Sequence, residues 1–372
     1  MRVQLVDPSA FTPQYDRALA AALAGAGLEV GLLTSRFLYG ELPPPEGFAV
    51  RELFYRRTSA RGLAAPGRRA LKAAEHLAGM ARLRGALDAD VVHYQWLTAP
   101  ALDRWLLPPP RPRVMTAHYV LTPRPSRREL RTARGLFGAM DAVIAHSEAG
   151  AGRLRELLGP GGPPVRVIPH GALDYLTRLG SERPLPAELE GAEGPVILFF
   201  GLLRPYKGLD VLLRAFAGLN GAELWIVGNP RMPLEELRGL AARAPGKVRF
   251  VTRYVEEAEI PAIFRRAEVV VLPYRDAEHS GVLYTALAFG RPMVLSAVGG
   301  FPELAEDHGA ARLVAPGDPE ALRGAIAELL GDAGAREELA AAARRAAAGP
   351  FSWERIAAQT AELYGELAGR GR

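Results

Sequence analysis

The sequence predicts an α/β protein made of two doubly wound, Rossmann-like domains in series, with a cleft between them. Strand-like and helix-like segments alternate along most of the chain, which is typical of parallel sheets covered by helices on both faces. The length of 372 residues exceeds one ordinary core. An irregular segment rich in proline and glutamate, residues 179–194, interrupts the alternation. We therefore expect a first domain over residues 1–172, a linker over 173–194 and a second domain over 195–351.

In the first half, short apolar segments predict strands, and the alanine-rich and leucine-rich segments between them predict helices. The expected strands are residues 2–7, 28–34, 49–54, 91–94, 113–117, 142–145 and 165–168. The expected helices are residues 14–24, 69–87, 99–106, 127–139 and 147–158.

The alternation resumes in the second half. The expected strands are residues 196–200, 223–227, 247–251, 269–272, 293–296 and 312–314, again with helices between them. The last helix, within residues 352–372, carries one long apolar stripe at helical spacing that includes Trp353, Ile356, Tyr364 and Leu367, with Ser352 as its N-cap. A stripe of this length must be buried, and we expect this helix to cross back and pack on the first domain.

Composition excludes several classes of protein. A hydrophobic content of 49% with 23% charged residues is typical of a globular protein, and no apolar run approaches the roughly 20 residues of a membrane span. Cysteine is absent, which excludes disulfides, thiolate nucleophiles and cysteine metal sites. The N-terminal segment reads as a strand without a signal-peptide core. We expect a cytoplasmic location, with peripheral attachment to the inner face of the membrane as an open alternative.

The net charge of +5 is unevenly distributed. Between Arg51 and Arg84 nine basic residues, Arg61 among them, face two acidic ones, and residues 124–134 hold five arginines beside Glu129. Such patches attract an anionic substrate, an anionic membrane or nucleic acid, and ordinary surface charge is the simpler alternative. Because no nucleic-acid motif accompanies them, we expect no nucleic-acid partner.

The most informative stretch is PVILFFGLLRPYKGLD, residues 195–210. It predicts a buried strand that stops at Gly201 and delivers Arg204 and Lys207 just before a helix. Unpaired N–H groups and the helix dipole make such a junction an anion site, and two added cations indicate a ligand with several negative charges, most simply a diphosphate. The alternative is solvated surface charge, although cations are electrostatically misplaced at a helix start.

Further polar residues follow other strands. The segment DAEHSGV, residues 276–282, comes after a predicted strand, and the backbone of Ser280, Gly281 and Val282 opens a helix that supplies a second anion-binding N-terminus. In the first domain His93 and His118 follow two strands at the level where ligands bind in α/β sheets.

Several familiar motifs are absent. No GxGxxG follows a strand, no Walker loop surrounds Lys207, and neither GxSxG nor HExxH occurs. Asp88 and Asp90 resemble a metal-binding pair, but they precede a strand on the side away from the expected cleft and are interpreted as structural.

Four segments resemble the retaining glycosyltransferases of family four, which have the GT-B fold. These segments are FFGLLRPYKGLDVLLRAF (199–216), HSGVLYTALAFGRPMVLSAVGGFPELAE (279–306), VIPHGALD (167–174) and FSWERIAAQTAELY (351–364). The resemblance covers about the whole chain and is strongest after residue 165.

The resemblance implies roles for particular residues. Arg204 and Lys207 hold the diphosphate of a nucleotide sugar, and His118 lies near the donor sugar as an orienting group. The remaining donor-binding positions are Gly201, Glu278, Ser280, Gly281, Val282 and Thr285. His93 and Tyr15 are assigned to the acceptor side. The family needs no divalent metal and no cofactor beyond its nucleotide-sugar co-substrate.

The sequence departs from the family pattern at two places. The second of two family glutamates spaced by eight residues is replaced by Thr285, and the position eight residues earlier is Ala277. Glu278 is the candidate replacement for the first. The glycine pair expected in the first turn is also missing, since residues 8–13 read PSAFTP.

The resemblance therefore implies a metal-independent, retaining hexosyltransferase that moves a sugar from a nucleotide-sugar donor to a carbohydrate or lipid-linked acceptor. Two alternatives stay open. One is a nucleotide-sugar epimerase of the same fold. The other is a non-catalytic two-domain protein that closes on a phosphorylated ligand.

Overall fold

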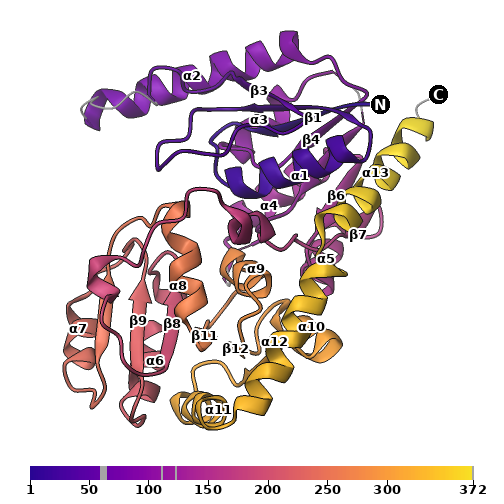
Figure 1. The fold of residues 1–372 in the computed structure, drawn as a ribbon. Coiled ribbons are helices and arrows are strands. Elements are labelled where there is room, and N and C mark those ends of the chain that lie inside the picture. Colours follow the sequence, from indigo (N-terminus) through magenta and orange to yellow (C-terminus); the bar gives the residue numbers. More distant parts are fainter. Residues whose placement is uncertain (59–64, 110–111, 122–123, 371–372) are drawn as a thin grey trace. The chain divides into compact units, whose positions relative to one another are not determined.

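The computed structural model describes residues 1–58, 65–109, 112–121 and 124–370. Arg61, one of the basic residues noted above, lies outside the described residues. The chain forms two compact units (Figure 1): unit 1 comprises Met1–Gly171 and Ser352–Arg372, and unit 2 comprises Ala172–Phe351. The stretch 173–194, expected as a linker, falls within unit 2.

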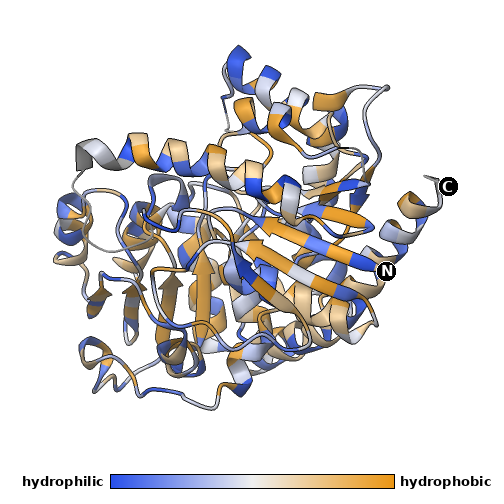
Figure 2. Ribbon diagram, turned by 90° about the horizontal axis from the view of Figure 1, so that it is seen from above, coloured by the Kyte–Doolittle hydropathy of each residue, from blue (hydrophilic) through white to orange (hydrophobic). Residues whose placement is uncertain are grey.

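Unit 1 contains a parallel sheet of seven strands in the order β3-β2-β1-β4-β5-β6-β7. Its strands are β1 (Arg2–Asp7), β2 (Glu29–Thr34), β3 (Ala49–Glu52), β4 (Val91–Tyr94), β5 (Arg113–Thr116), β6 (Ala142–Ala145) and β7 (Val165–Val167). Every residue of β4 and β6 is buried, as expected for central parallel strands covered on both faces. The hydrophobic colour along the strands in Figure 2 reflects this pattern.

Helices cover the sheet of unit 1. They are α1 (Pro13–Gly25), α2 (Ala65–Ala86), α3 (Pro100–Leu106), α4 (Arg127–Phe137), α5 (Glu148–Leu158) and α13 (Trp353–Arg370). Helices α4 and α5 begin where the Ser126 and Ser147 side chains accept hydrogen bonds from backbone N–H groups. Helix α13 packs beside α1 (Figure 1), and its Ile356 and Tyr364 are fully buried in the same cluster as Leu19. The prediction that the last helix packs on the first domain is confirmed.

Unit 2 contains a parallel sheet of six strands in the order β10-β9-β8-β11-β12-β13. Its strands are β8 (Val196–Phe200), β9 (Glu223–Val227), β10 (Val248–Val251), β11 (Val269–Leu272), β12 (Met293–Ser296) and β13 (Ala311–Val314). Its helices are α6 (Leu209–Phe216), α7 (Glu235–Ala241), α8 (Ile260–Arg266), α9 (Gly281–Ala288), α10 (Phe301–His308), α11 (Pro319–Gly331) and α12 (Ala333–Ala348).

The predicted α/β architecture is confirmed, with one informative difference at β3. The strand was expected to reach residue 54 but ends at Glu52. The N–H groups of Leu53 and Phe54 both donate to the Thr34 carbonyl, 2.9 and 3.3 Å away, so the regular ladder stops there. Tyr55 then adopts a left-handed backbone with φ of 48° and leaves the sheet.

The strand order reverses direction once in each sheet, between β1 and β4 in unit 1 and between β8 and β11 in unit 2. Ligands of open parallel sheets bind beyond the carboxyl ends of the strands at such reversals. The loops after β1, β4, β8 and β11 therefore lie at the expected ligand-binding edges. Among the described residues, no helix is both long and apolar enough to cross a bilayer.

Candidate functional site

The loop after β8 places a buried cation at the strand reversal of unit 2. Gly201 ends the strand with φ of 103°, a conformation that L side chains rarely adopt. An ideal Cβ at this position would lie 3.1 Å from Lys207 Nζ and 3.0 Å from Val282 Cγ2. The glycine therefore allows the lysine and the first turn of α9 to approach the same point of the backbone.

Lys207 ends a 3₁₀ helix, Pro205–Lys207, and is only 7% exposed. Its Nζ lies 4.9 Å from the centroid of the Tyr274 ring, within the range of a cation–π contact. No carboxylate forms an ion pair with it in the part of the chain that the structure describes. Its pKa is lowered to about 8, chiefly by burial; Tyr206 acts to raise it and the nearby charge of Arg204 acts to lower it.

Gly208 and an ion pair fix the position of this loop. Gly208 has φ of 67°, and an added Cβ would lie 1.9 Å from the Pro273 carbonyl oxygen. The Arg275 guanidinium donates to both carboxylate oxygens of Asp210 over 2.8 and 2.6 Å. The loop after β8 is thereby fastened to the loop after β11, a connection that local sequence patterns do not reveal.

The residues expected at the second helix start lie around the N-terminus of α9. Ser280, the N-cap, is buried, and its Oγ lies 3.2 Å from the Tyr274 hydroxyl. Thr285 Oγ1 donates to the Gly281 carbonyl over 2.9 Å, so its proton is directed to the helix backbone. Glu278 is buried, and its backbone carbonyl accepts from Gly300 over 3.2 Å.

The paired glycines Gly299 and Gly300, in the segment 279–306, support the Glu278 loop. Gly299 has φ of 52°, and an added Cβ would lie 1.7 Å from the Ala277 carbonyl oxygen. The sequence thus places three glycines, at 201, 208 and 299, where backbone segments touch. Within unit 2, Gly201, Arg204, Lys207 and the start of α9 can together bind an anion with more than one charge.

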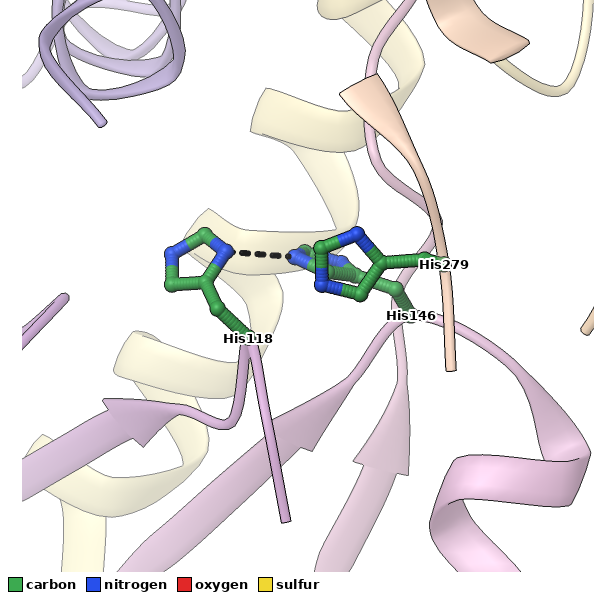
Figure 3. Close-up of side chains that lie close together, drawn as sticks. All are labelled: His118, His146 and His279. Carbon is green, nitrogen blue, oxygen red and sulfur yellow. Dashed lines mark hydrogen bonds between the residues drawn. The ribbon is translucent and has the colours of Figure 1, made fainter. Parts of the chain in front are cut away.

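In unit 1, His118 belongs to a cluster of rings at the carboxyl edge of the sheet. It stacks on Trp96 with ring centroids 5.1 Å apart and meets the edge of Tyr15 at 4.8 Å. His118 Nε2 donates to the Gln95 amide oxygen over 3.0 Å, and His146 Nδ1 donates to the Ile168 carbonyl over 3.0 Å. The other two ring nitrogens, His118 Nδ1 and His146 Nε2, lie 3.3 Å apart (Figure 3). These contacts fix the ring orientation of His118.

His93 and Tyr15, the two residues assigned to the acceptor side, are both buried. His93 is 0% exposed, and its ring nitrogens pair with the Tyr364 hydroxyl at 2.6 Å and with Thr116 Oγ1 at 2.7 Å. Burial lowers its pKa to about 3, so it stays neutral and joins the sheet to α13. Tyr15 is 3% exposed and packs against His170 at 4.7 Å between ring centroids. The acceptor-side assignment of both residues stays a prediction.

The turn after β1 lacks the expected glycine pair and is held by side-chain hydrogen bonds instead. The Asp7 carboxylate accepts from the N–H groups of Ser9, Phe11 and Thr12 over 3.1, 2.5 and 3.2 Å. Asp16, fully buried on α1, hydrogen-bonds Asp7. Burial and the adjacent Asp7 charge raise the pKa of Asp16 well above its ordinary value, so Asp16 holds the proton shared by the pair.

Asp88 and Asp90 are confirmed as structural. Asp90 accepts from the Arg2 backbone N–H over 2.8 Å, and Asp88 accepts from the Arg2 guanidinium over 2.5 Å. Both carboxylates therefore hold the start of β1 at the amino ends of the strands, opposite the ligand-binding edge.

Comparison with known proteins identifies the family. Residues 194–332 match the family described as Glycosyl transferases group 1, and residues 15–172 match Glycosyltransferase Family 4. A D-inositol 3-phosphate glycosyltransferase of Xylanimonas cellulosilytica is 30% identical over 76% of this chain and 73% of its own length. Another protein of that name, from Salinispora tropica, is matched over 66% of its own length.

Solved structures agree with the fold. Sucrose-phosphate synthase of Thermosynechococcus elongatus superposes with a TM-score of 0.78 at 20% identity, covering 100% of both chains. HepE of Anabaena in complex with UDP-glucose gives a TM-score of 0.74 at 21% identity over 99% of this chain and 100% of HepE. The family matches, the identity to a curated relative and the two parallel-sheet units agree, and the chain belongs to glycosyltransferase family 4, with the GT-B fold.

Proposed function

We propose that this glycosyltransferase moves a hexose from a nucleoside-diphosphate sugar to a hydroxyl acceptor with retention of anomeric configuration and without a divalent metal. The observation that carries the proposal is the buried Lys207 beside Gly201, next to Arg204 and the N-terminus of α9. A buried cation without a carboxylate partner is costly in the empty protein, and a diphosphate supplies the missing negative charge.

In the proposed reaction the bond between the anomeric carbon and the diphosphate oxygen breaks, and its electron pair stays on the diphosphate. The acceptor oxygen bonds to the anomeric carbon on the same face, and the acceptor proton passes to the departing phosphate oxygen. Lys207 and Arg204 stabilise the charge that grows on the leaving group, the task that a metal ion performs in other transferases. With a pKa of about 8, Lys207 is mostly protonated at neutral pH.

Named ligands of similar proteins support this choice of substrates. HepE is described in complex with UDP-glucose, and the relative from Xylanimonas is named for D-inositol 3-phosphate. We therefore propose a UDP-sugar as the first donor to test and a small polyhydroxylated acceptor. Within the proposed donor site, Gly201, Ser280, Gly281 and Val282 contribute backbone and shape, and the Glu278 carboxylate is assigned to the sugar hydroxyls.

The test compares Arg204→Ala and Lys207→Ala with Arg243→Ala and Lys247→Ala, two exposed cations of unit 2 away from the loop after β8. Loss of UDP binding and of turnover in the first pair only is expected, with activity unchanged by EDTA and an NMR spectrum showing retained configuration. Wild-type turnover in both Arg204→Ala and Lys207→Ala would refute the donor assignment. Incubation of donor alone separates an epimerase, which yields an isomer, from a binding protein, which yields no product with any acceptor.

We also propose that unit 1 attaches to anionic membranes from the cytoplasmic side. Helices α4 and α5 border a groove of about 800 Å³ whose lining combines cations with apolar side chains. The cationic residues are Arg127, Arg131, Arg134 and Arg153, and the apolar ones include Leu121, Leu130 and Leu157. Glu156 is the one acidic residue among its described lining residues. Arginines over an apolar floor fit a phosphate-bearing lipid surface.

Liposome flotation tests the membrane proposal. The protein should float with phosphatidylglycerol vesicles at low salt, and binding should weaken as salt is raised. Arg127→Glu with Arg131→Glu should abolish flotation, whereas Arg243→Glu in unit 2 should not. Equal flotation with neutral phosphatidylcholine vesicles, or none with either lipid, would remove the proposal.

A further inference from the structure

A small cationic pocket opens at the carboxyl ends of β1, β2 and β3 in unit 1. Its volume is about 150 Å³. The lining residues come from the loops after these strands and from α2: Ser9, Ala10, Ser35, Arg36, Phe37, Leu38, Tyr39, Tyr55, Thr58 and Lys72. A cavity of this order holds one six-membered ring, whereas drug-sized ligands occupy pockets of roughly 300–1,000 Å³. The pocket therefore suits a single sugar-sized ring and is too small for a nucleotide.

The charge of the pocket is positive. Arg36 and Lys72 line it, and no acidic side chain is among its described lining residues. Lys72 Nζ lies 4.9 Å from the centroid of the Tyr55 ring, so the ammonium is held over the aromatic wall. Glu75, which lies near on α2, is occupied by the N–H groups of Arg57 and Thr58 at 2.7 and 2.8 Å. An anionic group of a ligand is therefore attracted by two cations.

The inner wall is built on a buried chain of hydrogen bonds. Asp103 is 0% exposed, and its Oδ1 accepts from His76 Nε2 over 2.5 Å. The other ring nitrogen of His76, Nδ1, forms a hydrogen bond with the Tyr55 hydroxyl, 2.8 Å away. The Tyr55 oxygen also interacts with the hydroxyls of Ser9 and Thr98.

This chain determines what the pocket can recognise. Tyr55 is 4% exposed and holds a left-handed backbone with φ of 48°, a strained conformation kept where the surroundings enforce it. The hydroxyls of Tyr55, Ser9 and Ser35 line the pocket together and match a ligand with several hydroxyl groups. Phe37 and Tyr39, whose ring centroids are 5.7 Å apart, add the aromatic surface on which sugar rings pack.

We propose that this pocket binds an anionic, polyhydroxylated single ring, a sugar or cyclitol carrying a phosphate or a carboxylate. The inference rests on the proposed function, in which this ligand is the acceptor. Arg36 and Lys72 bind the anionic group, and the Tyr55 hydroxyl forms a hydrogen bond with a ring hydroxyl. His76 and Asp103 are positioning residues that hold the Tyr55 hydroxyl in place.

Isothermal titration with defined probes tests the proposal on the whole chain. The probes are glucose 6-phosphate, glucuronate and inositol monophosphate, with glucose, myo-inositol and inorganic phosphate as their counterparts. At least one anionic probe should saturate in the millimolar range or below, at least tenfold more tightly than its neutral counterpart. The phosphate and carboxylate arms identify the anionic group. Saturation by none of the three, or equal affinity for neutral rings, would overturn the proposal.

Variants locate the binding. Arg36→Ala and Lys72→Ala should each weaken the anionic probe about tenfold, and Arg128→Ala, an exposed cation of α4 outside the pocket, should leave it unchanged. Tyr55→Phe should weaken the ring probe but leave inorganic phosphate unaffected, a selectivity that a folding defect does not produce. Binding unchanged by Arg36→Ala and Lys72→Ala places the ligand elsewhere and refutes the proposal.

UDP titration of the same variants separates this inference from the proposed function. If all of these proteins bind UDP but none binds an anionic ring, only the pocket proposal is refuted. Absent UDP binding in wild-type protein removes the donor assignment, whatever the pocket binds.

Discussion

Replacing Lys207 with methionine should stabilise the empty protein while removing its affinity for donor. The side chain is 7% exposed, and burial lowers its pKa from 10.5 to about 8. At 1.36 kcal/mol per pKa unit, this difference means that the buried charge destabilises the native state by about 3 kcal/mol. Methionine keeps the length and apolar stem of lysine without the charge, so Lys207→Met should gain up to about 3 kcal/mol at pH 7.

The pH dependence follows from the direction of the pKa change. Between about 8 and 10.5 the unfolded chain holds the lysine proton and the folded chain has released it. Because the unfolded state binds more protons in this window, wild-type stability rises with pH across it and is lowest, with respect to this group, below about 8. The advantage of Lys207→Met should therefore be full at pH 7 and should vanish as the pH approaches 10.5.

Urea denaturation at pH 7, 8, 9 and 10 measures this difference, with the exposed Lys247→Met as the matched control. A diphosphate should also return the Lys207 pKa toward its ordinary value, so UDP binding near pH 8.5 should take up protons, as measured by calorimetry in buffers of different ionisation enthalpy. A Lys207→Met protein that is less stable than wild type at pH 7, or UDP binding without proton uptake, would refute the argument that the site is a buried cation awaiting an anion.

Three further predictions concern the framework of the two units. The raised pKa of Asp16 contributes stability below its ordinary value of 3.8, and this contribution is lost as the pH rises through the folded-state pKa. Asp16→Asn should remove this pH dependence, so its stability should fall less than that of the wild type as the pH rises. If wild type and variant show the same dependence of melting temperature on pH from pH 4 to 8, the prediction is wrong. Gly208→Ala should cost at least about 2 kcal/mol, whereas Gly239→Ala, in α7 with nothing within 4 Å of its Cβ, should gain about 1 kcal/mol in urea denaturation. Tyr364→Phe removes the 2.6 Å hydrogen bond to His93 and should destabilise by about 1–3 kcal/mol, and unchanged unfolding would show that α13 is held by apolar contacts alone.

The fold was predictable because its signals are local. A parallel strand such as β11, four buried residues between polar loops, carries its assignment in its own sequence. Expected and observed bounds differ mainly at ends, and at β3 the difference has a tertiary cause, since the Thr34 carbonyl takes two successive N–H groups. Histidines mark the limit of this reasoning. The sequence suggested equivalent places for His93 and His118 at the ends of their strands, but His93 lies within β4 whereas His118 follows the end of β5. The His93 ring bonds Tyr364, 271 residues away in sequence.

The two units differ in how openly the sequence displays their polar sites. In unit 2 the residues break local rules within one short stretch: a lysine and an arginine precede a helix start, and Gly208 supplies a backbone that only glycine adopts freely. Such local conflicts are expected at functional sites, where stability is given up for binding. In unit 1 the hydrogen-bonded residues Tyr55, His76 and Asp103 come from three separate segments. None of them belongs to a local sequence pattern that indicates a site. Tertiary packing joins the segment after β3 to α2 and α3, so this pocket is found from coordinates, whereas the loop after β8 is found from sequence.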